Sequence, residues 1–205
     1  ADVELASAID NPSVLADGRL ASNGNFHGAP VAYVLDFLAI AAADLASISE
    51  RRTDRLLDAD RSYGLAPFLA DQAGVDSGLM IAQYSQAALV SEMKRLGAPA
   101  SVDSIPSSGM QEDHVSMGWH AARKLRRSVD ALGAVLAIEV MAASRALALR
   151  APLAASPATA AVAARVNARG GPGHDRFLAP EIAAVVEAVR DGSLVAATAP
   201  FVTLD

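Results

Sequence analysis

The sequence predicts an all-α protein built as a bundle of long helices, and three observations support this. Of its 205 residues, 52% are hydrophobic but only 4% are aromatic, and 46 are alanines. Aromatic and β-branched residues, which favour strands, are too sparse for a sheet protein. Apolar residues instead recur at helical spacing along three long segments. We therefore expect closely packed helices joined by many small side chains, in a chain long enough to bury a core.

Charge composition argues against a nucleic-acid partner. The net charge is −6 and the pI is about 5.2, whereas nucleic-acid surfaces are basic. The one basic cluster, Arg123–Arg127, lies inside a helical pattern close to Asp130. We expect it to form a solvated or intersubunit face rather than a phosphate-binding patch.

The chain has no cysteine, which excludes disulfides and thiolate metal sites and is compatible with a reducing cytoplasm. It shows no secretory leader and no 18-residue apolar run without charges, so we expect a soluble protein without a membrane partner. It begins at Ala1 rather than at methionine, which suggests a processed or cut product.

Residues 1–27 should form a short extended or helical entry followed by loops, because Asp10-Asn11-Pro12 and Asp17-Gly18 are turn sequences. A long helix should begin near Ala29-Pro30, where proline suits the first turn. Its apolar stripe covers about 40 Å at ~1.5 Å per residue. The stripe consists of Val31, Val34, Leu35, Leu38, Ala42, Leu45, Ile48 and Leu56.

After an irregular stretch over 58–76, Ser77 is expected to be the N-cap of a second helix, 78–96. A loop over 97–110 should precede the third long helix, at about 113–149. The expected apolar face of that helix comprises Met117, Ala121, Leu125, Val129, Leu132, Leu136, Val140 and Leu147.

A weak helix over 158–168, a loop at Arg169–Gly173 and a last helix from Pro180 to Asp191-Gly192 should follow, with the tail from Leu194 left unassigned. The chain thus divides into an entry segment with a loop (1–28), a long-helix core (29–150) and small C-terminal helices with a tail (151–205). A helix of about 37 residues outruns a small domain, so an oligomeric core is expected. A monomeric bundle is the alternative.

The segment Met110–Gly118 places an amide, two carboxylates and an imidazole within a few residues. Asp113 suits a capping role at the start of the third helix, which would leave Glu112 free to point into a cleft. There, Glu112 would be usable as an acid or base. An ordinary capping pair is the alternative. His114 and His120 are six residues apart and would point in different directions from a helix, so no metal site is expected.

The polar, glycine-rich segment Ser22–Gly28 contains Phe26, either as an aromatic wall for a flat ligand or as packing beneath the loop. His27 could approach Glu112, but a hydrogen bond within its own loop is the favoured interpretation. Met80, in the first turn of its helix, is by default a core residue.

Several separate segments, in order, resemble histidine ammonia-lyases of the aromatic amino acid lyase superfamily. They are Ser22–Gly28, Ser49–Arg52, Gly64–Leu69, Leu79–Gln83, Ala100–Pro106 and Gln111–Ser116. The resemblance runs from Asp10-Asn11-Pro12 to about Arg150. It implies a long-helix bundle of the aromatic ammonia-lyase/aspartase-like type that forms the core of a homotetramer with shared active sites.

The resemblance implies a cytoplasmic lyase of histidine catabolism, which eliminates ammonia from L-histidine to give trans-urocanate. Its electrophile, a methylidene-imidazolone (MIO), forms from an Ala-Ser-Gly tripeptide that this chain lacks. The Tyr-Ser-Leu-Arg segment of the family is also missing. The chain should therefore be a C-terminal portion, inactive alone, whose partner is the N-terminal portion of the same lyase.

By the same resemblance, Glu112 contacts the imidazole of the substrate, and Phe26 lines the pocket. Asn11 and Gln111 hydrogen-bond near substrate or electrophile, and Met80 packs beside the substrate. Phenylalanine lyases carry lysine where Met80 stands and Asn-Gln-Asp where Gln111-Glu112-Asp113 stands, which favours histidine here. The alternatives are a catalytically silent helical assembly module and a tyrosine or phenylalanine lyase or aminomutase.

Overall fold

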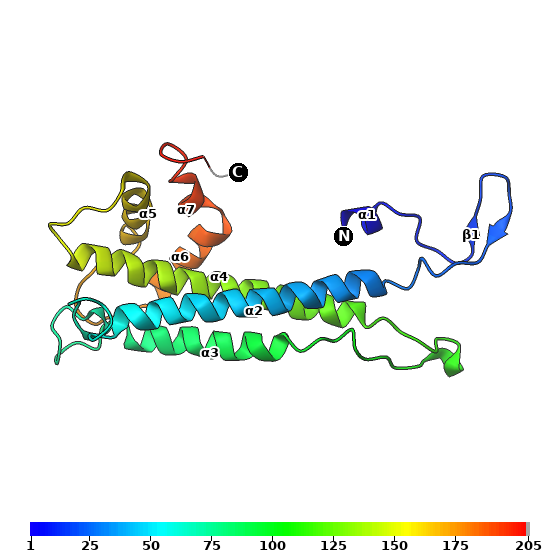
Figure 1. The fold of residues 1–205 in the computed structure, drawn as a ribbon, viewed down its shortest axis with the longest axis horizontal. Coiled ribbons are helices and arrows are strands. Elements are labelled where there is room, and N and C mark those ends of the chain that lie inside the picture. Colours follow the sequence, from blue (N-terminus) through cyan, green and yellow to red (C-terminus); the bar gives the residue numbers. More distant parts are fainter. Residues whose placement is uncertain (204–205) are drawn as a thin grey trace. The chain divides into compact units, whose positions relative to one another are not determined.

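The computed structural model describes residues 1–203 and confirms the all-α prediction (Figure 1). Its α-helices are α1 (Asp2–Leu5), α2 (Ala29–Leu57), α3 (Met80–Leu96), α4 (Gly118–Leu149), α5 (Pro157–Asn167), α6 (Ala179–Arg190) and α7 (Ser193–Ala196). Two 3₁₀ turns, η1 (Pro67–Leu69) and η2 (Ser108–Met110), interrupt the loops. The strands β1 (Ser13–Val14) and β2 (Leu20–Ala21) form a small antiparallel hairpin.

The chain folds as two compact units. Unit 1 comprises Ala1–Ala41 and Lys94–Ser128, and unit 2 comprises Ala42–Met93 and Val129–Asp205. Helices α2 and α4 each contribute residues to both units. This division follows contacts rather than segments of sequence, so the expected parts 1–28, 29–150 and 151–205 stay a prediction.

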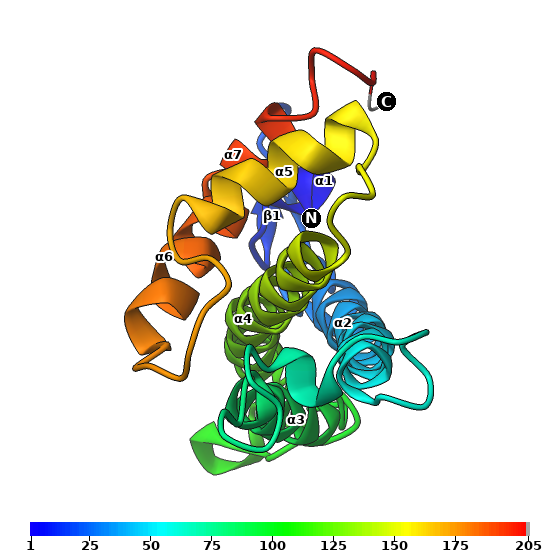
Figure 2. The same ribbon diagram turned by 90° about the vertical axis from the view of Figure 1, so that its left-hand side faces the viewer.

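In unit 2, parts of α2, α3 and α4 form a three-helix core. Ala43 and Ala46 of α2, Val90 and Met93 of α3 and Val135 of α4 make one buried cluster. Figure 2 shows α5, α6 and α7 lying beside α4. A second buried cluster joins them to it through Ala137, Met141, Val166, Val185, Ala188 and Leu194.

The apolar stripe predicted for α2 is largely wrong as a core face. Val34, Leu38, Leu45 and Ile48 are exposed, by 53%, 47%, 43% and 48%. Apart from Leu57 at the end of the helix, the buried face of α2 consists of small or polar side chains: Ala32, Asp36, Ala39, Ala43, Ala46, Ser49, Glu50 and Thr53. Alanine lets helices approach closely, and the larger apolar residues are left on the opposite side of α2.

Two predicted helix starts are also wrong. The third long helix begins at Gly118, not near Asp113, because Met117 adopts a left-handed φ of 51° that breaks the helical run. Ser116 Oγ accepts the Gly118 amide there, so Asp113 caps no helix. The second helix begins at Met80. The predicted N-cap, Ser77, instead donates its own amide to Asp175, which lies in the loop after α5.

The start of α2 at Ala29 and the turn at Asp17-Gly18 are confirmed. Pro30 lies in the first turn of α2. Gly18, at φ 82°, closes the β1–β2 hairpin by donating its amide to Leu15. By length and composition alone, α2 and α4 are each apolar enough to cross a membrane, a test that core helices of water-soluble proteins also pass.

A buried ion pair holds unit 1 together. Lys124 Nζ donates to Asp36 Oδ1 at 2.9 Å, and the two side chains are 11% and 3% exposed. Lys124 also donates to the carbonyl of Ala98, and the amide of Ser101 donates to Asp36 Oδ2 at 2.8 Å. Burial alone would raise the pKa of Asp36, but the hydrogen bonds from Lys124 and Ser101 lower it overall. Lys124 is therefore not on the solvated face expected for the basic cluster.

Replacing Lys124 by methionine should destabilise the complete protein by about 3–5 kcal/mol, because it leaves the Asp36 carboxylate buried without its cation. The double variant Lys124→Met/Asp36→Leu should recover most of that loss, since no unpaired charge remains. Urea unfolding at one fixed protein concentration measures both. If the stability lost in the double variant equals the sum of the losses caused by each substitution alone, the two side chains are not energetically coupled.

Gly78 cannot carry a side chain without disturbing unit 2. Its φ is 60°, and an added Cβ would clash with the carbonyl oxygen of Phe68 and lie 2.9 Å from the amide nitrogen of Ala70. Gly74 has a φ of 90° but open space around it. The two glycines therefore separate backbone strain from steric clash.

We predict that Gly78→Ala lowers stability by about 2–5 kcal/mol, the combined cost of left-handed backbone and overpacking. Gly74→Ala is the matched control and should cost only the backbone part, about 1–2 kcal/mol. Urea midpoints of the complete protein give the comparison. Equal losses of stability in the two variants would show that the steric clash with Phe68 and Ala70 does not contribute.

Candidate functional site

Two polar loops of unit 1 lie against each other. His27, in the loop before α2, places Nε2 2.8 Å from the carbonyl oxygen of His114. Because a carbonyl only accepts, Nε2 must carry the proton in this contact. The two imidazole rings also stack, with centroids 4.9 Å apart and planes at 15°. The expectation that His27 bonds within its own loop is wrong for its side chain.

Close backbone contacts support the same junction. A Cβ on Gly28, whose φ is 74°, would lie 3.8 Å from Ser116 Oγ. A Cβ on Gly118 would lie 3.6 Å from Cβ of Ala32. The segments Ser22–Gly28 and Gln111–Gly118 therefore meet at His27 with His114 and at Gly28 with Ser116, and Gly118 lies against Ala32 of α2.

The first loop is shaped by a local hydrogen-bond network. Asn11 Oδ1 accepts the Asn23 amide at 3.0 Å, and Asn23 Nδ2 donates to Ser13 Oγ at 2.9 Å. The side chain of Asn23 also accepts the amide of Asn25 at 2.8 Å. This ties Asn11 to the loop that carries Phe26, whose side chain is 46% exposed.

The second loop presents Gln111 and Glu112 away from any helix. Ser107 and Glu112 form an isolated antiparallel bridge, with N–O distances of 3.0 and 3.3 Å. The amide of Val115 donates to Ser104 Oγ at 2.8 Å and fixes the far side of the loop. Within residues 1–203, the side chains of Gln111 and Glu112 are exposed and make no hydrogen bond.

The structure thus brings the loops of four predicted site residues into unit 1: Asn11, Phe26, Gln111 and Glu112. Met80 belongs to unit 2, where it begins α3 and is half-buried. Glu112 keeps its predicted loop setting but not its predicted place at a helix start. The contact between His27 and His114 joins the two loops, and the roles of Phe26 and Glu112 stay a prediction.

A second group of polar side chains escaped the sequence prediction. Asp71, Asp76 and His174 lie together in unit 2, with potential ligand atoms within 4.8 Å of one another. Asp76 Oδ2 accepts from Nδ1 of His174 at 3.0 Å, and Oδ1 accepts the Asp175 amide at 3.1 Å. The Asp175 amide and His174 lower the pKa of Asp76, and the same carboxylate raises that of His174.

These contacts fasten the loop after α5 to the loop before α3. The amides of Ser77 and Gly78 donate to the Asp175 carboxylate at 2.7 and 2.8 Å. The Asp76 carboxylate accepts from the amides of Gln72 and Asp175 and from the imidazole of His174, so it acts here as a structural acceptor. Asp76 and His174 are 98 positions apart in the sequence, which explains why no local sequence pattern indicated this contact.

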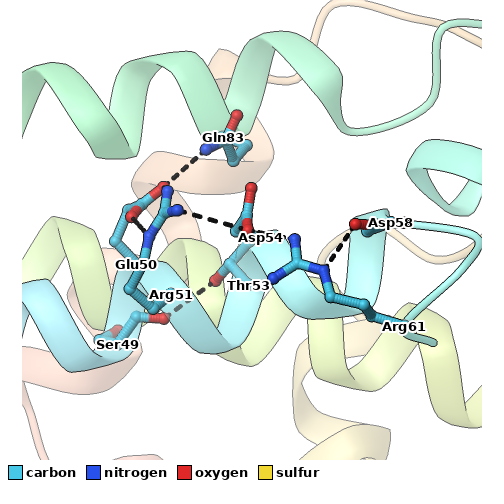
Figure 3. A network of polar contacts seen from close by, with 8 residues as sticks. All are labelled: Ser49, Glu50, Arg51, Thr53, Asp54, Asp58, Arg61 and Gln83. Carbon is cyan, nitrogen blue, oxygen red and sulfur yellow. Dashed lines mark hydrogen bonds and ion pairs between the residues drawn. The ribbon is translucent and has the colours of Figure 1, made fainter.

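A third polar network lies on α2 (Figure 3). Glu50 is 5% exposed, accepts from Arg51 at 2.5 and 2.7 Å, and accepts from Gln83 Nε2 of α3 at 2.6 Å. Arg51 in turn reaches Asp54 at 3.4 Å. Gln83 lies one helical turn after Met80, so this network fixes the first turns of α3 against α2 within unit 2.

Comparison with known proteins identifies the family to which these loops belong. The model of the family described as aromatic amino acid lyase matches residues 1–168. A histidine ammonia-lyase of Streptomyces avermitilis is 72% identical over 199 residues, which is 96% of this chain. The chain spans 39% of the length of that relative.

Solved structures agree. A histidine ammonia-lyase from Trypanosoma cruzi matches with a TM-score of 0.93 at 41% identity, over 98% of this chain and 40% of that one. A tyrosine aminomutase from Streptomyces globisporus matches with the same TM-score at 37% identity, over 99% of this chain and 39% of that one. The chain belongs to the aromatic amino acid lyase family.

Proposed function

We propose that this chain is the C-terminal portion of a histidine ammonia-lyase, whose complete form eliminates ammonia from L-histidine to give trans-urocanate. The identity of 72% to a protein named histidine ammonia-lyase supports this substrate. The single observation that carries the proposal is structural. The loop of Glu112 meets the loop of Phe26 through the His27–His114 contact at 2.8 Å.

In this proposal the two loops form one wall of the substrate site. Phe26 offers a flat apolar surface to the imidazole ring, and the Glu112 carboxylate accepts a ring N–H. Asn11 and Gln111 supply amides near the reacting end of the substrate. Within the described residues, the side chains of Gln111 and Glu112 are exposed, so both are accessible for binding a substrate.

The carboxylate of Glu112 gives a physical basis for selecting histidine. An imidazole ring carries an N–H donor, whereas a phenyl ring carries none. A phenyl substrate would leave a desolvated acceptor unpaired, which costs about 1–3 kcal/mol or more for a charged group. Glutamine at this position would accept a hydrogen bond less strongly than a carboxylate.

The elimination breaks a Cβ–H bond and the Cα–N bond, forms the Cα=Cβ bond and releases ammonia. The electrophile of the family, the methylidene-imidazolone, makes the amine a better leaving group when present. This chain has no Ala-Ser-Gly to form it. The exposed amides of Asn11 and Gln111 fit the role of hydrogen-bond partners for such a group on the N-terminal portion.

The exposed apolar face of α2 supports an oligomer with shared active sites, a homotetramer in this proposal. Tyr33, Val34 and Phe37 in unit 1 are 54%, 53% and 69% exposed, although α2 is a regular helix with a well-packed opposite face. Contiguous apolar surface of this kind marks protein–protein contacts. The absence of cysteine fits a cytoplasmic setting.

The tyrosine aminomutase match supports a second candidate, a lyase or aminomutase acting on tyrosine or phenylalanine. A silent assembly module is the candidate from another class. The complete protein separates all three, since they predict turnover of histidine, turnover of tyrosine or phenylalanine, and no turnover.

We predict that Glu112→Gln in the complete protein lowers kcat/KM for L-histidine at least tenfold, and by up to about 10⁴-fold if the carboxylate also moves a proton. The reason is the loss of the charged acceptor for the imidazole. Urocanate absorbance measures the rate.

Asp113→Asn is the matched control. It removes the adjacent exposed carboxylate, which caps no helix, and should change kcat/KM less than twofold. If Glu112→Gln turns over L-histidine at the wild-type rate, Glu112 does not contact the substrate. No urocanate from a folded complete wild-type protein would favour the assembly module.

A further inference from the structure

The imidazole of His27 links the two loops that carry proposed substrate residues. Phe26 directly precedes His27 in the sequence. The carbonyl oxygen of His114, which accepts the Nε2 proton of His27 across 2.8 Å, lies two residues after Glu112. The rings of the two histidines also stack, with centroids 4.9 Å apart. The position of the His27 ring is therefore coupled to the backbone that carries Glu112.

The backbone around His27 is held on both sides. The amide of His27 donates to the carbonyl of Gly24 at 3.1 Å, and the carbonyl of the next residue, Gly28, accepts the amide of Ala32 at 3.1 Å. Helix α2 begins directly afterwards, at Ala29. His27 is half-buried, and its ring thus projects from the fixed start of a long helix.

Glu112 lies in the long segment between α3 and α4, away from any α-helix. Ser107 exchanges two backbone hydrogen bonds with Glu112, and the amide of Val115 donates to Ser104 Oγ. These bonds join residues of the same segment, so they shape it without fixing its place against α2. The hydrogen bond from His27 comes from outside the segment and supplies such a fixed point.

We propose that His27 is a positioning residue for histidine selectivity: by holding the carbonyl of His114, it sets where the Glu112 carboxylate meets the substrate. This inference rests on the proposed contact between Glu112 and the substrate imidazole. A hydrogen bond weakens steeply as its distance and angle depart from the optimum, so a displaced carboxylate would lose part of its preference for a ring with an N–H donor. His27 acts through the loop and not by contact with the substrate.

The test compares the steady-state kinetics of three variants of the complete protein with L-histidine. His27→Ala removes the donor and should lower kcat/KM about five- to tenfold, mostly through KM, as expected for one lost hydrogen bond. His27→Gln offers an amide Nε2 donor at a similar reach and should recover kcat/KM to within about twofold. His120→Ala, which changes an exposed histidine of α4 in unit 1, is the matched control and should alter kcat/KM less than about twofold.

A double-mutant cycle separates positioning from a general loss of structure. If His27 acts through Glu112, His27→Ala should change kcat/KM less than about twofold when Glu112→Gln is already present. Hydrogen–deuterium exchange of residues 111–117 gives a readout that does not depend on activity. Exchange there should be faster in His27→Ala and return to the wild-type rate in His27→Gln.

Three results would overturn this inference alone while the wild-type protein still turns over L-histidine. They are a wild-type kcat/KM in His27→Ala, unchanged exchange of residues 111–117 in that variant, and losses from His27→Ala and Glu112→Gln that multiply in the double variant. Failure of His27→Gln to restore kcat/KM would contradict the hydrogen bond to His114 as the positioning contact. No turnover of L-histidine by the wild-type protein would overturn the proposed function as well.

Discussion

One imidazole joins two loops that are 87 residues apart in the sequence: Nε2 of His27 donates to the carbonyl of His114 across 2.8 Å. The ring stacking of the two histidines and the close approach of Gly28 to Ser116 reinforce this contact. Behind the loops, the buried pair of Asp36 and Lys124 fixes the adjoining parts of α2 and α4 within unit 1. These contacts hold together the two loops that carry Phe26 and Glu112.

Helix α2 shows how the same segment serves packing and assembly. Alanine and small polar side chains form its buried face, which permits close helix packing but buries little apolar area per residue. Its large apolar side chains, such as Phe37 at 69% exposed, point away from the protein. In a chain that spans 39% of a relative's length, this surface suits contact with protein outside the chain.

The sequence predicted the features that neighbouring residues determine, such as helix starts and helix positions. Proline at the first turn gave the start of α2, and the spacing of apolar residues gave the long helices. The start of α4 was missed because Val115 and Met117 continue the apolar spacing, while the left-handed backbone of Met117 interrupts the helix. The burial of α2 was also missed, since periodicity finds the larger apolar stripe and not the alanine face that other helices cover.

Long-range partners were beyond any local pattern. Asp175 accepts the amide of Ser77 from 98 positions away, and the side chain of His27 bonds outside its own loop. The family resemblance, by contrast, rested on short motifs such as Ser22–Gly28, and the match to the aromatic amino acid lyase family confirms it. The most direct measurement is a crystal structure of the complete protein with a bound histidine analogue. The account predicts that Phe26 and Glu112 contact the same imidazole ring and that protein covers Phe37; a ring that touches neither side chain would contradict it.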